Sequence, residues 1–281
     1  MFVLRTNQNH RLDHRWIPGT DPSAPTLVFL HQGLGSISTW RDFPDRVVAE
    51  TGASALVYSR LGHGHSDPLT EPRGLDYLHR EALEVLPSVL DQMGIDDPLL
   101  IGHSDGASIA LIFAAASGWP LRGAIIEAPH IFVEPITLAG VRQMTETART
   151  TDLLERLKRH HRSPEPLFRA WSDTWLEPSF AGWNIESLLP DIECPLLLIQ
   201  GEDDEYGTPE QVHAIARQIS ASSQTLLLPG CGHTPHRDRA ELVLKVQADF
   251  IRRIIAESKA ANRTAKDRVK EDQRCAALCA P

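Results

Sequence analysis

The sequence contains few cysteines, and their spacing does not suggest a covalent scaffold. Its 281 residues include only four, namely Cys194, Cys231, Cys275 and Cys279. These are too few and too unevenly spread to form a disulfide framework in a chain of this length, so we expect reduced thiols. No nearby histidine or second cysteine pair completes a zinc site around Cys275 and Cys279. The cysteine content therefore excludes a small disulfide-stabilised fold.

Long apolar runs and basic clusters are also missing. No window of about 18 residues is uninterruptedly apolar, as a bilayer-spanning helix would require. The first segment, MFVLRTNQNHRLDHRW, lacks the apolar stretch of a secretory signal. Acidic residues outnumber basic ones by 37 to 28, which gives a formal net charge of −9. We therefore expect a cytoplasmic protein with neither a membrane nor a nucleic acid as partner.

The sequence does contain enough apolar material for a sizeable core, since 42% of its residues are hydrophobic. Short apolar, β-rich runs alternate with longer amphipathic stretches, a pattern typical of a parallel sheet with crossover helices. The predicted strands are 26–31, 53–60, 98–103, 123–128, 195–200 and 225–229. The segments FVLRT and HRLDHRW are predicted to form an antiparallel hairpin at one sheet edge.

Helical spacing of apolar residues predicts helices over 39–50, 76–93, 105–116, 209–219 and 239–257. The alternation stops at 130–190, where helical patterns and three tryptophans occur without a convincing strand. We interpret 130–190 as an inserted helical cap, and 1–129 with 191–257 as the α/β core. Residues 258–281 carry mixed charges and few large apolar residues, which predicts a polar tail, frayed or helical.

The most informative motif is Gly102-His103-Ser104-Asp105-Gly106, a G-x-S-x-G sequence between a predicted strand and a predicted helix. In that context the turn holds the serine in a strained conformation, and the flanking glycines avoid collisions with neighbouring backbone. Ser104 is therefore predicted to be a nucleophile at the carboxyl edge of the sheet. An ordinary strand-to-helix turn is the alternative interpretation.

A serine nucleophile needs a histidine as base and a carboxylate that orients the histidine. His233 follows the predicted strand 225–229, which makes it the candidate base among 13 histidines. The loop after strand 195–200 offers both Asp203 and Asp204, and Glu127 is a third candidate acid. The order Ser, Asp, His is that of α/β-hydrolases.

With these motifs in order, residues 2 to 257 resemble the α/β-hydrolase superfamily, in particular its capped serine esterase and C–C hydrolase branch. The resemblance implies that the acid lies three residues after Gly201, which selects Asp204. The segment Leu30-His31-Gln32-Gly33-Leu34 resembles the H-G-x-G oxyanion loop of that family, although Gln32 stands where glycine is commoner. The oxyanion donors implied are the backbone N–H groups of Gly33 and Asp105, with Leu34 as the alternative.

Other chemistries fit the sequence less well. Gly33-Leu34-Gly35-Ser36 lacks the third glycine of a dinucleotide-binding loop. His63 with His65, or His160 with His161, lacks the spacing and the additional ligands of a zinc protease. We therefore predict a metal-free and cofactor-free enzyme. A non-catalytic receptor of the same fold remains the alternative from another class.

The function predicted is hydrolysis of a small carboxylic ester or lactone, a small-molecule partner, with amide or C–C bond cleavage as the alternative. Substrate-binding candidates are the cap residues Trp171 and Trp175, together with Asp105. The carboxylate of Asp105 has two interpretations, as a helix N-terminal cap or as a group that selects amino-bearing substrates. The sequence leaves the oligomeric state open.

Overall fold

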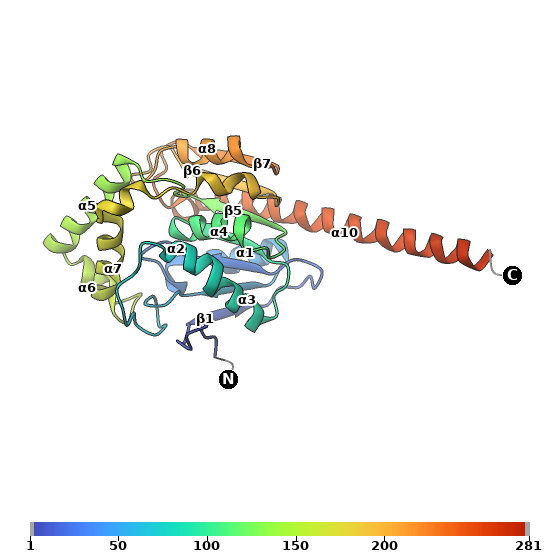
Figure 1. Cartoon of the computed structure of the whole chain (residues 1–281), viewed down its shortest axis with the longest axis horizontal. Helices are drawn as coiled ribbons and strands as arrows, with labels where there is room; N and C mark the ends of the chain where they lie inside the picture. The colour runs from blue at the N-terminus through green and yellow to red at the C-terminus, as the bar shows by residue number, and fades with distance from the viewer. Residues whose placement is uncertain (1–2, 279–281) are drawn as a thin grey trace.

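A seven-stranded sheet forms the centre of the protein (Figure 1). The computed structural model describes residues 3–278, with side chains through residue 260. The strand order is β1-β3-β2-β4-β5-β6-β7, and only β1 runs antiparallel to its neighbour. The strands are β1 (His14–Ile17), β2 (Leu27–Leu30), β3 (Ala55–Tyr58), β4 (Leu99–His103), β5 (Gly123–Glu127), β6 (Leu196–Gly201) and β7 (Ser223–Leu228). The predicted, largely parallel sheet is confirmed.

The predicted N-terminal hairpin forms, but it is short. The FVLRT segment turns back on HRLDHRW at the antiparallel bridge between Arg5 and Arg11, where the N–H groups of Thr6 and Leu12 donate to the carbonyls of His10 and Leu4 at 2.8 Å. Strand β1 continues from this hairpin at the sheet edge, where it pairs antiparallel with β3, His14 opposite Tyr58. The buried strand β3 offers a full row of backbone partners along an apolar strand, whereas FVLRT is short and polar at its end.

Helices cover both faces of the sheet, as crossover connections require. On one face lie α1 (Phe43–Thr51) and α10 (Ala240–Leu278), which pack with β2 and β3 in one hydrophobic cluster. On the other face lie α4 (Asp105–Ala116), α8 (Glu210–Gln218) and one continuous helix over 77–93. That helix consists of α2 (Tyr77–Arg80), a π-helical segment (Glu81–Val85) and α3 (Leu86–Met93).

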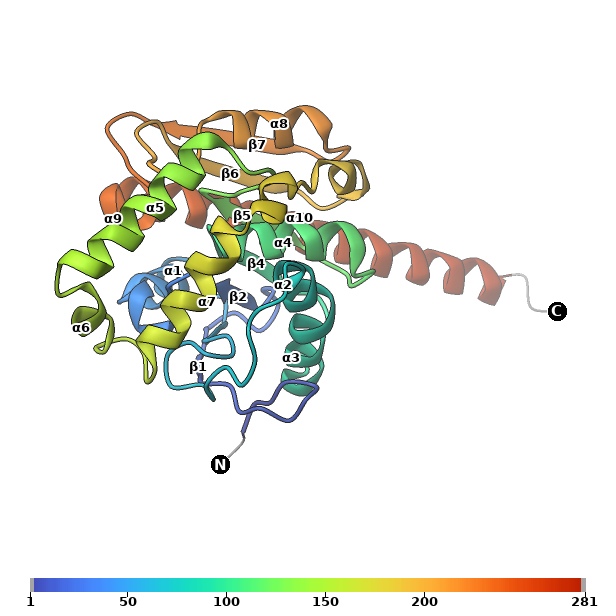
Figure 2. The ribbon, with the colours of Figure 1, turned by 60° about the vertical axis from the view of Figure 1, so that its left-hand side comes forward.

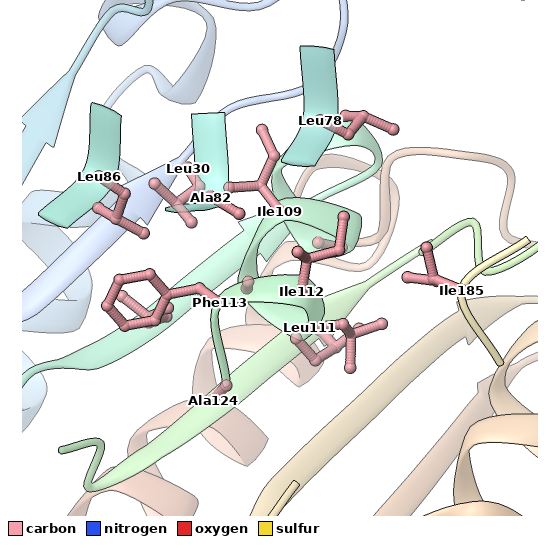
Figure 3. Close-up of a cluster of buried hydrophobic side chains, with 14 of the residues drawn as sticks. Leu30, Leu78, Ala82, Leu86, Ile109, Leu111, Ile112, Phe113, Ala124 and Ile185 are labelled. Atoms are coloured by element: carbon pink, nitrogen blue, oxygen red, sulfur yellow. The ribbon is translucent and has the colours of Figure 1, made fainter. Parts of the chain in front are cut away.

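Helix α4 passes through the middle of the second face. Its residues from Asp105 to Phe113 are all buried, as expected for a helix that is apolar on every side. Figure 3 shows Ile109 of α4 beside Leu78 and Ala82 of the neighbouring helix. Because the core encloses its whole first half, α4 holds its N-terminus in a fixed position at the sheet edge.

The segment between β5 and β6 carries the cap helices. These are α5 (Pro135–Thr150), α6 (Leu153–Leu157) and α7 (Pro164–Leu176), followed by 3-10 turns Pro178–Gly182 and Glu186–Asp191. Figures 1 and 2 show α5, α6 and α7 grouped at one end of the molecule. The division of the chain at 129 and 191 stays a prediction, but the helices lie where it places the cap.

Helix α10 does not stop at Glu257 but continues to Leu278 and projects away from the sheet (Figure 2). Residues 258–278, left open as frayed or helical, are thus helical, while 279–281 lie outside the described residues. Among the described residues, no helix combines the length and the apolar character of a bilayer span. Cys194 and Cys231 are free, buried thiols, and burial raises the pKa of Cys231 to about 11.

Candidate active site

Ser104 stands in the sharp turn between β4 and α4. Its backbone angles, φ of 55° and ψ of −119°, lie outside the regions that residues other than glycine favour. A Cβ at Gly102 would lie 2.4 Å from the Gly106 carbonyl oxygen, and one at Gly106 only 1.9 Å from that of Leu30. The two glycines are therefore required by close backbone approach, and the turn presents Ser104 at the carboxyl edge of the sheet.

The structure brings His233 and Asp204 to this serine. The Ser104 hydroxyl lies 2.9 Å from Nε2 of His233, whose Nδ1 lies 2.9 and 2.8 Å from the two carboxylate oxygens of Asp204. The three residues are 6%, 8% and 4% exposed. This arrangement can pass the serine proton to Nε2 while the carboxylate holds the Nδ1–H tautomer.

Of the three candidate acids, only Asp204 reaches His233. Its Oδ1 accepts the backbone N–H of Tyr206 at 2.8 Å, and its Oδ2 accepts the Gln200 side-chain amide at 2.7 Å. The neighbouring Asp203 is exposed. Glu127 is engaged elsewhere, because its carboxylate accepts Nδ1–H of His236 at 2.7 Å and the side-chain amide of Gln247.

The pKa values of the pair follow from their contact. Burial acts to raise the pKa of Asp204, but His233 and the hydrogen bonds to the carboxylate hold it below its ordinary value. Burial acts to lower the pKa of His233, but Asp204 raises it above its ordinary value, with smaller contributions from Glu205 and Asp105. The pair therefore favours an ionised aspartate and stabilises an imidazolium when one forms.

The residues predicted to supply oxyanion donors border the same cavity as Ser104. Asp105 is the first residue of α4, so its N–H has no acceptor within the helix. Gly33 and Leu34 line the same cavity as Ser104. Nearby, the guanidinium of Arg60 donates to the carbonyl oxygens of His31 and Gln32 at 2.7 and 3.1 Å. These bonds hold the loop with its carbonyls turned toward Arg60.

The cavity around Ser104 has a volume of about 210 Å³. Both predicted substrate-binding tryptophans, Trp171 and Trp175 of α7, line it, and so does Asp105. Its remaining lining residues are Gln32, Gly33, Leu34, His130, Thr137, Val141, Met144, Glu205, Tyr206, His233, Thr234 and Arg237. The cavity is smaller than typical drug-sized pockets.

Comparison with known proteins identifies the family. The alpha/beta hydrolase family profile matches residues 27–246, most of the chain. The chain belongs to the alpha/beta hydrolase family.

Several relatives are similar over most of this hydrolase. It is 30% identical over 263 residues to a 2-succinyl-6-hydroxy-2,4-cyclohexadiene-1-carboxylate synthase of Klebsiella pneumoniae subsp. pneumoniae, covering 82% of this chain and 95% of the synthase. It is 24% identical over 258 residues to a proline iminopeptidase of Lactobacillus delbrueckii subsp. bulgaricus, covering 78% and 87%. A thermophilic esterase structure from Thermogutta terrifontis aligns with TM-score 0.69 and 20% identity, covering 90% of this chain and 98% of the esterase. The predicted fold is confirmed, and the relatives support a hydrolase.

The Asp105 carboxylate of this hydrolase binds two side chains from other parts of the chain. Its Oδ2 accepts the Tyr77 hydroxyl at 2.8 Å and lies 3.5 Å from the Arg60 guanidinium. The Tyr77 hydroxyl in turn accepts the indole N–H of Trp175 at 3.1 Å. The carboxylate thus accepts a hydrogen bond from a buried tyrosine and pairs with a buried arginine, so the capping hydrogen bond is not what occupies it. Its position in the first turn of α4 still places a negative charge at the positive end of the helix dipole. The carboxylate still lines the cavity, so its role in substrate selection stays a prediction.

Sequence reasoning missed His130 as part of the site. Its ring stacks on His233 with 5.8 Å between centroids, and it lines the cavity while 3% exposed. Ala128, two residues before it, has a positive φ of 46°, so the backbone of the turn after β5 is strained. Burial lowers the pKa of His130 to about 4, so the ring is neutral at pH 7. Its position just after a strand end was the available signal.

Proposed function

We propose that this chain is a cofactor-free serine hydrolase that cleaves a small carboxylic ester or lactone through an acyl-enzyme. The observation that carries the proposal is the continuous series of hydrogen bonds from Ser104 through His233 to Asp204, with distances of 2.9 and 2.8 Å. Ser104 and His233 also line one cavity. A buried serine–histidine–carboxylate line of this kind is the arrangement that activates a serine hydroxyl.

In the proposed reaction, Ser104 Oγ attacks the ester carbonyl carbon as Nε2 of His233 takes the hydroxyl proton. The carbonyl π electrons move to oxygen, and the resulting oxyanion accepts hydrogen bonds from the backbone N–H groups of Asp105 and Gly33. The tetrahedral intermediate collapses, and the leaving alkoxide takes the proton from His233. Water, deprotonated by the same nitrogen, then attacks the acyl-enzyme and releases the acid and free Ser104.

The cavity walls support a small substrate with an apolar side. Trp171 and Trp175 supply flat apolar surfaces from α7, and Val141 and Met144 extend this surface along α5. A volume of about 210 Å³ admits a short acyl group together with a modest alcohol, or a monocyclic lactone. We therefore propose short esters and small lactones as the substrate class.

A panel of short aliphatic esters, aromatic esters, lactones and thioesters tests this proposal. We expect turnover of at least one ester or lactone, and a loss of at least about a thousandfold in kcat for Ser104→Ala with unchanged circular dichroism. A folded protein that hydrolyses no member of the panel, or whose activity survives Ser104→Ala, would contradict the proposal. That outcome would favour the receptor alternative.

Cleavage of an amide or ester next to an amino group is a second candidate. It is favoured by the proline iminopeptidase relative and by two carboxylates, Asp105 and Glu205, on the cavity wall. The test is the ratio of kcat/KM for an amino-bearing ester over its neutral isostere, in the wild type and in Asp105→Asn. A ratio that falls in the variant supports amine selection by Asp105, whereas an unchanged ratio removes Asp105 as its source.

A further inference from the structure

The loop that carries Gly33 is held by its carbonyl oxygens, and one holder comes from the cap. The Gln32 carbonyl accepts hydrogen bonds from Nδ1–H of His31 at 2.8 Å, the guanidinium of Arg60 at 3.1 Å and the backbone N–H of Gly35 at 3.0 Å. The Leu34 carbonyl lies 3.0 Å from Nε2 of His161, 127 residues away along the chain. His161 lies in the segment that joins α6 and α7, so this bond links the cap to the oxyanion loop.

The contacts of His161 determine its tautomer. The backbone N–H of Gly64 points at Nδ1 from 3.0 Å, and an N–H donor requires a bare nitrogen there. The ring proton must therefore sit on Nε2, where it is donated to Leu34. His161 is 3% exposed, and burial lowers its pKa to about 4, so the ring stays neutral near pH 7. Both nitrogens are thus used, each in one role.

The backbone beside His161 strengthens the same contact. The N–H of Arg162 donates to the Gly64 carbonyl at 2.9 Å, so the cap segment binds both polar groups of Gly64. A Cβ at Gly64 would lie 2.4 Å from the Ser59 hydroxyl, and its φ is +57°. Neighbouring side chains therefore pack closely against this glycine, and its backbone conformation is one that other residues rarely adopt. Gly64 thus gives the imidazole a fixed support.

Two peptide planes connect His161 to the proposed oxyanion donor. In a trans peptide the C=O and the following N–H point in opposite directions, and no described peptide bond is cis. When His161 holds the Leu34 carbonyl, the same plane aims the Gly35 N–H, which donates to Gln32 at 3.0 Å. The Gln32 carbonyl belongs to the plane that carries the Gly33 N–H. His31 and Arg60 hold one side of this Gln32 plane, and His161 constrains it from the other side through the Gly35 N–H, so His161 contributes to the orientation of the Gly33 N–H through a chain of aligned bonds.

We propose that His161 is a positioning residue that aims the oxyanion loop from the cap, so that the oxyanion site is complete only when the 161–162 segment is seated on Gly64. This inference rests on the proposed serine hydrolase function. It assigns His161 no contact with substrate.

His63 is the alternative holder of the same loop, but its role is less defined. Its Nε2 lies 3.0 Å from the Gly33 carbonyl and its Nδ1 lies 3.1 Å from that of Leu61. Burial lowers the pKa of His63 far below its ordinary value, so the ring is neutral and donates to only one of the two carbonyls. The Arg73 guanidinium also lies 3.4 and 3.2 Å from the Nδ1 and Nε2 atoms of His63, so these contacts do not select a tautomer, whereas those of His161 do.

The test compares matched variants on paired substrates. His161→Phe keeps an aromatic ring and removes both nitrogens, while His161→Gln retains one acceptor and one donor. His160→Phe is the control, because His160 lies in the same segment and bonds the Ser38 hydroxyl at 2.8 Å instead of the loop backbone. Each protein is assayed on an ester and on its thionoester, whose C=S sulfur is a weak hydrogen-bond acceptor.

For His161→Phe we expect a fall in kcat of about tenfold or more on the ester, with KM within about threefold and little change on the thionoester. His161→Gln should recover most of the ester rate, and His160→Phe should match the wild type. A merely structural histidine would slow both substrates alike. An unchanged ester-to-thionoester ratio in folded His161→Phe therefore overturns the proposal.

The nitrogen-15 chemical shifts of the His161 imidazole report its tautomer by NMR. Because they are measured on the wild-type protein, a variant that fails to fold cannot confuse the result. The proposal requires a neutral ring protonated at Nε2, and a ring protonated at Nδ1 or at both nitrogens contradicts it. A wild type with no Ser104-dependent hydrolysis would overturn the proposed function and this inference together. Wild-type activity with an unchanged substrate ratio overturns this inference alone.

Discussion

Replacing Asp204 by asparagine tests the assignment of the acid most sharply, because a control residue lies next to it. The asparagine side chain has one acceptor oxygen where the carboxylate has two. We expect that oxygen to stay with the two backbone N–H groups of Tyr206 and Gly207, at 2.8 and 3.3 Å, which leaves the single Gln200 amide donor, at 2.7 Å, without its acceptor. The amide NH2 is then left toward Nδ1 of His233, where the carboxylate oxygen now lies 2.8 Å away.

An NH2 group in that place favours the imidazole tautomer that is protonated at Nε2, and such a ring cannot accept the Ser104 proton. The negative charge that stabilises the imidazolium is also lost. We expect kcat to fall on the order of a thousandfold or more, equivalent to about 4 kcal/mol of transition-state stabilisation. Steady-state kinetics on an active ester, with active-site titration of the enzyme, measure this loss.

The matched control is Asp203→Asn. Asp203 is exposed, and its backbone N–H donates to the Cys231 carbonyl at 3.0 Å whatever the side chain is. The kcat of Asp203→Asn should stay within about threefold of the wild type, as is usual for substitutions of exposed residues that make no buried contact. If Asp203→Asn were the more damaging of the two, the loop would place the other carboxylate against His233 and the reasoning would be wrong.

Three further results are expected. In a pH profile, kcat/KM should fall toward acid pH as His233 becomes protonated, with a midpoint above pH 6.5, because the neighbouring carboxylates raise the pKa of His233 despite its burial. A midpoint below pH 6.5 would contradict this prediction. Glu127→Gln should lower the free energy of unfolding by about 3 kcal/mol, because it breaks the buried pair with His236, yet it should reduce kcat less than about tenfold. Urea unfolding and steady-state kinetics measure the two effects, and a loss of kcat like that of Asp204→Asn would refute this prediction. Gly106→Ala should cost at least about 3 kcal/mol, because its Cβ would lie 1.9 Å from the Leu30 carbonyl oxygen; wild-type stability in the same unfolding assay would disprove that clash.

Features that depend on short stretches of sequence could be predicted. Ser104 was recognisable because its turn needs glycines at both flanks, and the collisions at Gly102 and Gly106 give the physical reason. The helix over 105–116 agrees with α4 at both ends, since its apolar residues occur on every side of one uninterrupted segment. The apolar runs that predicted β4 and β5 are buried along their whole length.

Features that depend on distant partners could not. One of the two interpretations of the Asp105 carboxylate was a cap of its own helix, but Tyr77 and Arg60, brought close by the fold, bind the carboxylate. Likewise, nothing in the spacing of His161 indicates that Leu34 is its acceptor. The pairing of β1 with β3 was not predicted for the same reason, because β3 is distant from β1 in the sequence.

The central claim, that His233 and the surrounding donors activate Ser104, is tested most directly by covalent labelling. A fluorophosphonate is incubated with the folded protein, and the modified peptide is located by mass spectrometry. We predict one adduct, on Ser104, that forms rapidly in the wild type and is absent from Ser104→Ala. Labelling of another residue, or no labelling of folded wild-type protein, would contradict the account.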